Sequence, residues 1–408
     1  MNNKKSVLNS ITKAGAAGVN LRKLCKHRTA GTTRKFLKEL ISEGKVKELS
    51  IQNKNKTTTR LFILAEDDER EALGHAFVNF LVTGKTRDEI IHTFGDHADA
   101  LIAGEYQGYN KFEQLNDFGE KVWILLPEVR NDLIVQPRDW TYNIGKNGKG
   151  ESQPYIMAQL PDKAFHDANF GECIRIAPIA DVHYGHKACR IEKWLAYLRW
   201  IEETPGLYAI ILGDLMENAL DDGRGMSYDQ DKDPQTQLDE MTAMIAPIAH
   251  KVLLMTRGNH EARTFKRSGI DPMRILAERL DIPYFSGPSI AAILAGGHKW
   301  SVYTFHGKGN AQTKGGRMNA AGVARKFTGF INFYLSGHTH DPMANSETCI
   351  VEDPINCRLI YPQQWTVVTS SFLAWENTYA YDAGYAPSGR GGVILELYKN
   401  GDYNASMR

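Results

Sequence analysis

Five apolar runs after residue 172 each end in a polar side chain. The runs cover residues 173–180, 207–212, 250–256, 299–305 and 329–336. Roughly 32 to 47 residues separate one polar ending from the next, which leaves room for a helix and a return to the sheet. Because ligands gather at the carboxyl ends of strands in α/β sheets, we expect the polar endings to converge. The pattern therefore predicts an α/β fold with a polar site at one edge of the sheet.

The first 66 residues show helical spacing first and strand-like alternation afterwards. Apolar positions predict helices over residues 4–15, 21–28 and 31–44. Two strand-like runs, residues 45–52 and 59–65, follow them and are joined by a polar turn. This order of elements resembles a winged helix-turn-helix domain, and the resemblance implies that the third helix enters the major groove of DNA.

The region between these two parts combines helical and strand-like patterns. Residues 67–130 are predicted to form a second, helical or winged-helix-like domain, in which Thr86 and Glu89 have the spacing of a capping box. Residues 131–171 are predicted to be a linker with leading strands, and we expect a linker or mobile loop at 144–154, which is rich in Gly, Asn and Pro. Residues 172–408 form the remaining predicted domain.

Charge is distributed unevenly along the chain. Residues 1–60 contain 15 Lys and Arg against 3 Asp and Glu, a net charge of +12, whereas residues 61–150 contain 9 against 16, a net charge of −7. A basic end on a near-neutral protein is typical of a polyanion-binding module. We therefore expect the winged-helix region to bind nucleic acid, and DNA in particular. A solvated charged face or a protein-docking module is the alternative. The candidate contacts on the third helix and the wing tip are Arg34, Lys35, Lys38, Lys54 and Lys56.

The overall composition excludes several classes of protein. With 42% hydrophobic and 24% charged residues, the chain has the composition of a soluble globular protein. Its five cysteines form no CxxC pair, which disfavours a zinc ribbon or a disulfide framework and fits a reducing cytoplasm. The chain has no signal-peptide pattern, and no apolar stretch approaches the roughly 18 to 20 residues of a membrane span. We expect a cytoplasmic protein without a membrane partner, and leave a homodimer and an ATPase partner open.

Histidine is concentrated at the five strand endings. The chain has 13 histidines, and five of them belong to these motifs. The motif set, in chain order, is Asp181, His183, Asp214, Asn259, His260, His306, His338 and His340. This set resembles the calcineurin-like metallophosphoesterase superfamily over about residues 172–345. The resemblance implies a β-sandwich flanked by helices, with a site for two divalent metals.

The resemblance also implies a role for each side chain in the motif set. The ligands of the first metal would be Asp181, His183 and His340. The ligands of the second metal would be Asn259, His306 and His338. Asp214 would bridge both metals, and His260 would be the catalytic histidine, which lies near the substrate oxygens and protonates the leaving group.

The chemistry of such a site is consistent with these residue types. Two metals about 3.5–4 Å apart clamp a phosphoryl group and lower the pKa of a water that attacks phosphorus in line. A carboxylate suits the bridging position because it offers two oxygens and a charge. Mixed imidazole, carboxylate and amide ligands suit Mn²⁺, Fe²⁺ or Zn²⁺ better than Mg²⁺ or Ca²⁺, and among these we expect Mn²⁺.

The motifs differ between branches of the superfamily. The segment from Arg257 to Glu261 has the form found in Ser/Thr protein phosphatases, whereas recombination nucleases usually carry Asp at the last position. The segment after Asp214 lacks the substrate arginine of the phosphatases, and the opening Asp-Val-His-Tyr-Gly is nearer to the nuclease branch. With the basic N-terminus, this predicts a dinuclear-metal-dependent phosphodiesterase that hydrolyses nucleic acid. A metal-dependent phosphomonoesterase acting on protein or nucleotide, and a catalytically silent DNA-binding regulator, are the alternatives.

Several residues near the motifs have open roles. Glu261 either orients His260 or an arginine, or forms a structural salt bridge. His186 is expected in a surface loop. The loop after His306 either covers a phosphate backbone or carries solvated charges, and its basic residues are Lys308, Lys314, Arg317, Arg325 and Lys326. The last 65 residues are expected to complete the second sheet.

Overall fold

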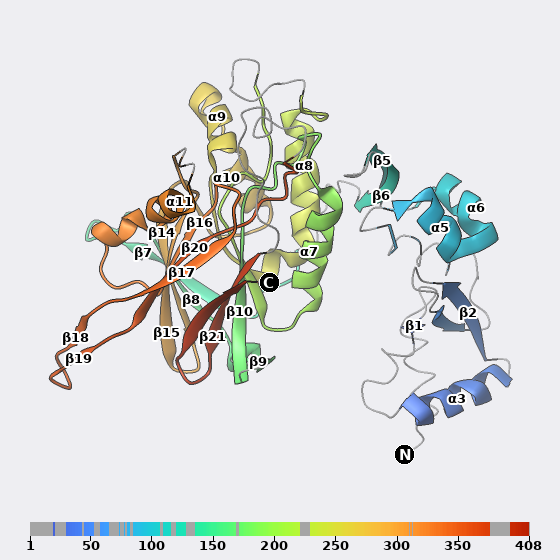
Figure 1. The fold of residues 1–408 in the computed structure, drawn as a ribbon, viewed down its shortest axis with the longest axis horizontal. Helices are drawn as coiled ribbons and strands as arrows, with labels where there is room; N and C mark the ends of the chain where they lie inside the picture. Colours follow the sequence, from blue (N-terminus) through green and yellow to red (C-terminus); the bar gives the residue numbers. More distant parts are fainter. Residues whose placement is uncertain are drawn as a thin grey trace. The chain divides into compact units, whose positions relative to one another are not determined.

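The structure is a computed structural model, and its chain divides into two compact units, Met1–Glu128 and Val129–Arg408 (Figure 1). The described residues of the first unit are 19–20, 30–42, 45–52, 58–64, 73, 77, 80–81, 85–106, 109–115 and 120–127. Those of the second unit are 135–407 without 169–170, 221–228, 310, 312 and 376–391. The first two predicted helices, and Lys54 and Lys56, lie outside the described residues.

The beginning of the first unit contains a helix and a small antiparallel sheet. Its elements are β1 (Val19–Asn20), α3 (Ala30–Ser42), β2 (Val46–Gln52) and β3 (Thr58–Leu64). Helix α3 and the β2–β3 hairpin agree with the third helix and the two strands that the sequence predicts. Strand β3 also pairs with β1, which gives the strand order β1-β3-β2. Leu37 and Leu40 are the buried face of α3.

The rest of the first unit has its own small core. Its elements are β4 (Lys85–Thr86), α5 (Arg87–Phe94), η2 (Gly95–His97), α6 (Ala98–Ala103), β5 (Tyr109–Leu115) and β6 (Lys121–Pro127). The predicted capping box is confirmed, because Thr86 Oγ1 accepts from Glu89 N at 3.2 Å and Glu89 Oε2 accepts from Thr86 N at 3.1 Å. Phe77, Ile90 and Leu125 are buried together in the core of this region.

The first sheet of the second unit has seven strands, with the order β13-β12-β11-β10-β21-β22 and β9 paired to β10. The strands are β9 (His166–Ala168), β10 (Gly171–Ile179), β11 (Leu207–Ile211), β12 (Val252–Thr256), β13 (Tyr284–Phe285), β21 (Val393–Tyr398) and β22 (Tyr403–Met407). Strands β10 to β13 are parallel neighbours, and β21 and β22 add to them antiparallel. Strands β11 and β12 are buried throughout, and β10 is buried from Cys173 onward apart from the half-buried Arg175, as a parallel sheet covered on both faces requires.

The second sheet also has seven strands, with the order β17-β20-β16-β15-β14-β8-β7. They are β7 (Thr141–Lys146), β8 (Ser152–Gln159), β14 (Ser289–Ala295), β15 (His298–Phe305), β16 (Phe333–Ser336), β17 (Met343–Thr348) and β20 (Gln363–Val368). The stretch 144–154, expected to be a linker or mobile loop, is instead the β7–β8 hairpin. Asn147 Oδ1 accepts from the backbone N–H groups of Lys149 and Glu151 and closes its turn.

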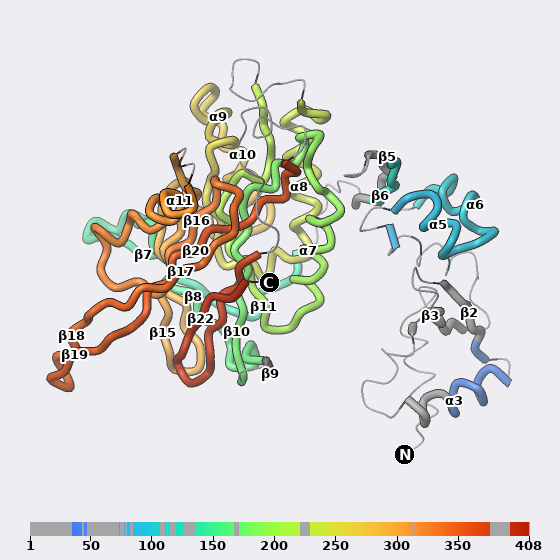
Figure 2. Tube along the Cα trace, viewed as in Figure 1, coloured from blue at the N-terminus to red at the C-terminus, as the bar shows by residue number. Residues whose placement is uncertain are grey.

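The end of the chain contributes to both sheets. As expected, β17 and β20 extend the second sheet, but β21 and β22 join the first sheet instead, because β21 pairs with β10. The apolar run after Arg358 is also interrupted. It divides into β19 (Arg358–Ile360) and β20 on either side of Pro362, which has no N–H for a strand ladder. Strand β19 pairs with β18 (Val351–Asp353) in a hairpin that continues the β17–β20 pair outward (Figure 2).

The two sheets pack face to face around one core, which takes Ile176 and Leu395 from the first sheet and Trp300, Phe333 and Val367 from the second. The surrounding helices are α7 (Ile191–Glu203), α8 (Pro234–Ile245), η5 (Ala246–Lys251), α9 (Asn259–Ser268), α10 (Pro272–Arg279), α11 (Lys314–Ala321) and η6 (Gly322–Lys326). Helices α7 and α10 pack on the first sheet and α11 packs on the second (Figure 1). The unit is therefore a helix-flanked β-sandwich of mixed α/β class. No helix among the described residues is long and apolar enough to span a membrane.

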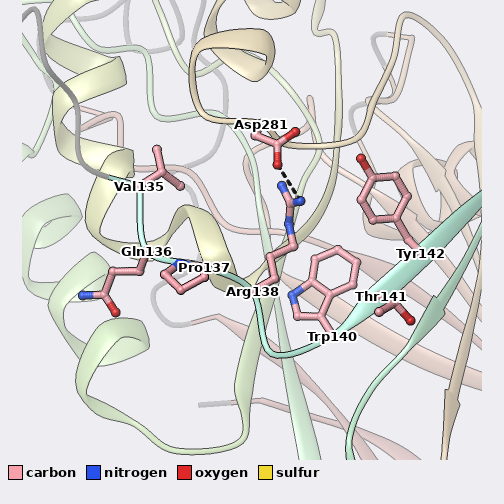
Figure 3. A pocket seen from close by; sticks show the side chains of 8 residues that line it. All are labelled: Val135, Gln136, Pro137, Arg138, Trp140, Thr141, Tyr142 and Asp281. Atoms are coloured by element: carbon pink, nitrogen blue, oxygen red, sulfur yellow. Dashed lines mark hydrogen bonds and ion pairs between the residues drawn. The ribbon is translucent and has the colours of Figure 1, made fainter.

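A pocket of about 420 Å³ lies between the segment that leads into β7 and Asp281, which follows α10 (Figure 3). Arg138 lines it, lies over the rings of Trp140 and Tyr142, and bonds Asp281 Oδ2 at 2.8 Å. Trp140 Nε1 donates to the backbone oxygen of His250, two residues before β12. None of the residues that line this pocket belongs to the motif set, of which only Asn259 and His260 come shortly after β12.

Candidate metal centre

The polar strand endings of both sheets come together in the structure. All five predicted apolar runs contain a strand, and β10, β11, β12, β15 and β16 each end shortly before a motif residue. The run 329–336 is a strand only from Phe333. Just before the strand, the side-chain oxygen of Asn332 accepts from the backbone N–H of Ser301 at 2.8 Å. Three endings come from the first sheet and two from the second, so the site lies where the two sheets meet at one edge.

The backbone at these endings adopts an uncommon conformation. Eight non-glycine residues in the described part of the chain have positive φ, and five of these are predicted metal ligands. They are Asp181, His183, Asp214, His338 and His340, with φ between 51° and 70°. Asp, Asn and His tolerate this left-handed region better than other residues do, although it still carries strain. The concentration of left-handed residues at these endings indicates that the surrounding packing holds the site in place.

The first group of predicted ligands contains Asp181, His183 and His340, whose donor atoms lie within 4.8 Å of one another. Asp181 Oδ2 accepts from the backbone N–H of His338 at 2.7 Å. Asp181 Oδ1 is buried without a hydrogen-bond partner and lies 3.4 Å from His340 Nε2. The Nε2 atoms of His183 and His340 are 3.1 Å apart. An orphaned buried carboxylate oxygen beside two imidazole nitrogens is a donor set that suits a divalent cation.

The second group contains Asp214, His306 and His338, and Asn259 joins it through its side chain oxygen. His306 donates from Nδ1 to the backbone oxygen of Leu212 at 2.8 Å, which directs Nε2 into the site. There, Nε2 lies 2.9 Å from Asn259 Oδ1 and 3.1 Å from Asp214 Oδ2. Burial opposes a charge on His306, but Asp214 overcomes it and raises the pKa of His306 to about 10. The position beside Nε2 therefore attracts positive charge.

Asp214 and His260 lie between the two groups. Asp214 Oδ1 accepts from the backbone N–H of His260 at 2.8 Å, and Asp214 also forms a close group with His183 and His260. The His260 ring donates from Nδ1 to the backbone oxygen of Glu217 at 2.7 Å, because a carbonyl can only accept. Its Nε2 lies 3.8 Å from Asp214 Oδ2. Burial lowers the pKa of His260 to about 4, so the ring is neutral near pH 7 with Nε2 as an acceptor.

Glu217 is a residue of the site that the motif analysis did not select. Its Oε2 lies 2.9 Å from His183 Nδ1 and 3.4 Å from His260 Nδ1, and the residue is 5% exposed. Burial opposes ionisation, but His260 and His183 outweigh it and hold the pKa of this carboxyl at about 2. A carboxylate behind a ligand histidine fixes the ring so that its other nitrogen points into the site. The signal for this role was a carboxylate three residues after Asp214 in the same loop.

Glu261 supports the backbone of the site and forms neither of the contacts expected for it. Its Oε2 accepts from the N–H groups of Asp214 and Gly258, both at 3.1 Å, and its Oε1 accepts from Met216 N at 3.1 Å. The carboxyl is fully buried, and burial, followed by the charge of Asp214, raises its pKa to about 7. Glu261 therefore ties the loop after β11 to the start of α9.

Two glycines make this close approach of the loops possible. A Cβ on Gly213, where φ is +90°, would lie 2.1 Å from Gly258 N. A Cβ on Gly258 would lie 2.1 Å from Asp214 Oδ1 and 2.2 Å from Asp214 N. These distances are far below van der Waals contact, so each loop has room for the other only because both positions lack a side chain.

The remaining predicted residues have varied positions. His186 is 8% exposed rather than on a surface loop, and its Nδ1 accepts from Ala188 N at 3.0 Å. In the basic loop after β15, Arg317 pairs with Asp341 at 3.0 Å and Arg325 pairs with Glu347 at 2.8 Å. The basic side chains of this loop that stay exposed are Lys308, Lys314 and Lys326. The loop thus combines structural ion pairs with solvated charges.

In the first unit, two of the predicted nucleic-acid contacts have described side chains. Lys35 and Lys38 are both exposed on α3. Arg34 belongs to the same helix. In the second unit, the described Cys189, Cys349 and Cys357 form no disulfide.

Comparison with known proteins identifies the domain that carries this site. Residues 174–342 match the calcineurin-like phosphoesterase family. No curated protein matches the chain. Among solved structures, the calcineurin-like phosphoesterase YfkN from Bacillus subtilis is similar, with 14% sequence identity and a TM-score of 0.29, over 58% of this chain and 90% of that one. Members of the family use divalent metals, and the Asp and His clusters described above fit that use. Residues 174–342 therefore form a calcineurin-like phosphoesterase domain, which implies a metal-dependent phosphoester hydrolase.

Proposed function

We propose that this protein is a phosphodiesterase that uses two divalent metals, with Mn²⁺ preferred, to hydrolyse nucleic acid, and that its N-terminal unit brings it to DNA. The observation that carries the proposal is the convergence of two carboxylates, four imidazoles and one amide around two adjacent positions. This site is joined in one chain to a region with a net charge of +12 over residues 1–60. A polyanion is the substrate that both features have in common.

In this proposal, each group of ligands holds one metal and Asp214 lies between them. Bound cations would stabilise the phosphoryl oxygens and lower the pKa of the attacking water. Glu217 and the backbone oxygen of Leu212 hold the rings of His183 and His306 so that Nε2 of each points inward. Nε2 of His260 carries no proton in the neutral ring, so it would first take up a proton from solvent and then pass it to the leaving-group oxygen.

The described parts of the first unit support DNA targeting through their element order and charge. A helix followed by a hairpin is the order expected for the end of a winged-helix domain, and Lys35 and Lys38 are solvent-exposed on that helix. Lysines at such positions contact phosphates and contribute affinity that falls with salt. The remaining candidates are Arg34 on α3 and Lys54 and Lys56 between β2 and β3.

An assay series with the Mn²⁺-loaded protein tests the proposed substrate. The substrates are a diester reporter, a monoester reporter, and plasmid, linear duplex and single-stranded DNA. We expect turnover of the diester reporter and cleavage of at least one DNA form. Turnover of the monoester alone would overturn the proposal in favour of a phosphomonoesterase. Tight DNA binding without any turnover would identify a silent regulator.

A further inference from the structure

One arginine reaches the site from helix α9. Arg263 lies one turn after His260, and its Nη2 is 3.1 Å from His260 Nε2. Its Nη1 is 3.4 Å from the backbone oxygen of Glu217 and 3.7 Å from Glu217 Oε1. The side chain is 22% exposed, compared with 13% for His260 and 6% for Glu217, so Arg263 is the most solvent-accessible of the three.

The hydrogen bonds around His260 determine what the guanidinium can do there. His260 Nδ1 carries the proton that it donates to the Glu217 backbone oxygen, so in the neutral ring Nε2 accepts from Arg263. Nε2 is also the nitrogen nearer to Asp214. A phosphate oxygen that approaches Nε2 must therefore meet the cation 3.1 Å away. A guanidinium presents five N–H donors in a planar fork, which matches the oxygens of a phosphate.

We propose that Arg263 is a phosphate-contacting residue of this site, which binds a non-bridging oxygen of the substrate and places the ester beside Nε2 of His260. This inference rests on the proposed hydrolysis of a phosphodiester. When the substrate binds, Arg263 gives up its hydrogen bond to His260 Nε2 and bonds the phosphate instead. Nε2 then faces the leaving-group oxygen.

Glu217 keeps Arg263 in position during this exchange. Its carboxylate is buried and also bonded to His183 Nδ1 at 2.9 Å, so it stays in place when the guanidinium changes partner. It also offsets part of the arginine charge. The pair therefore has no formal net charge but presents directed donors, which suits the single negative charge of a phosphodiester better than the double charge of a monoester.

The test uses the full-length Mn²⁺-loaded protein with inorganic phosphate and bis(p-nitrophenyl) phosphate as probes. The variants are Arg263→Ala, Arg263→Lys and, as a control, Arg279→Ala, which removes the same charge from a surface pair with Asp239 on α10 and α8. We expect Arg263→Ala to weaken phosphate binding and to raise KM for the diester by about 10- to 100-fold each. Arg263→Lys keeps the charge without the fork and should lie between Arg263→Ala and the wild type. Bound Mn²⁺ and the melting temperature should stay unchanged in both.

The outcomes separate this inference from the proposed function. Phosphate affinity within twofold of the wild type in both Arg263 variants would overturn the role of Arg263, and so would a wild type that binds no phosphate. If Arg263→Lys, like Arg263→Ala, loses bound Mn²⁺ and kcat together, the arginine only supports the metal ligands. If the phosphate effect is found but no nucleic acid is cleaved, the role of Arg263 stands and the proposed substrate is wrong.

Discussion

At the scale of single residues, both ring nitrogens of His260 have partners, Nδ1 the backbone oxygen of Glu217 and Nε2 the guanidinium of Arg263. The bond from Nδ1 to the Glu217 backbone oxygen leaves Nε2 directed toward Asp214. We expect His260→Ala to lower kcat by about 10²- to 10⁴-fold, because it removes a proton-transfer group. The metal content after dialysis against Mn²⁺, measured by plasma mass spectrometry, should be retained.

His298→Ala, at the start of β15, is the matched control, because it removes an imidazole from the far end of the same strand that leads to His306. It should leave kcat unchanged. Loss of both metals in His260→Ala would show that His260 is a ligand rather than a proton-transfer residue. The measurement separates the two roles of His260, because His260 lies close enough to His183 and Asp214 to share a metal with them.

Glu261 shows that a motif residue can act entirely through the backbone. In Glu261→Gln, the amide nitrogen must face at least one of the three N–H groups that the carboxylate now accepts. A buried donor without a partner costs about 1–3 kcal/mol, so we expect the free energy of unfolding in urea to fall by that amount. Glu203→Gln, on an exposed end of α7, provides the control. An unchanged unfolding midpoint in Glu261→Gln would contradict this role.

At the scale of elements, the loop after β11 and the start of α9 are built as one piece. Gly258→Ala would place a Cβ at 2.1 Å from Asp214 Oδ1, so Asp214 must move. We expect more than about a tenfold loss of metal affinity, of the size seen when ligand-supporting groups are removed, together with loss of diester turnover. Metal titration monitored by calorimetry measures the first effect.

Gly287→Ala is the control for this substitution, because a Cβ there meets nothing within 4 Å. It should bind metal as the wild type does. If Gly258→Ala also binds metal normally, Asp214 does not depend on the close contact between the two loops.

The element pattern was largely predictable from the sequence, and the local bonding was not. Apolar runs placed the five strands that end at the site, because buried parallel strands have a strong sequence signal. The prediction of a linker or mobile loop at 144–154 was wrong, because a hairpin on a sheet edge exposes most of its side chains and therefore has a polar, loop-like sequence. The roles of Glu217 and of Glu261 depend on contacts between loops distant in sequence, which no local spacing records.

At the scale of the whole molecule, the proposal assigns DNA contact to the first unit and catalysis to the second. We expect the double variant Lys35→Ala/Lys38→Ala to weaken duplex DNA binding and to reduce the slope of log K against log salt by about 2, since each phosphate contact contributes about 0.9. Fluorescence anisotropy at several NaCl concentrations measures the slope. Turnover of a small diester should not change.

Lys146→Ala/Lys149→Ala is the matched control, because it removes two exposed lysines from the β7–β8 hairpin of the second unit. It should keep the wild-type salt slope. Equal slopes in all three proteins would show that α3 makes no phosphate contact, and DNA targeting would then need another surface.

The left-handed backbone at five predicted ligand positions restricts how this protein can diverge. At Asp181, His183, Asp214, His338 and His340, replacements by Asn or Gly keep the local conformation, whereas β-branched residues do not. Descendants that lose the metals are therefore expected to drift first to Asn and Gly at these places while the fold persists. Such descendants would keep the fold after losing the metal ligands. Backbone conformation at these five positions would then indicate the fold, whereas the side chains there would indicate the activity.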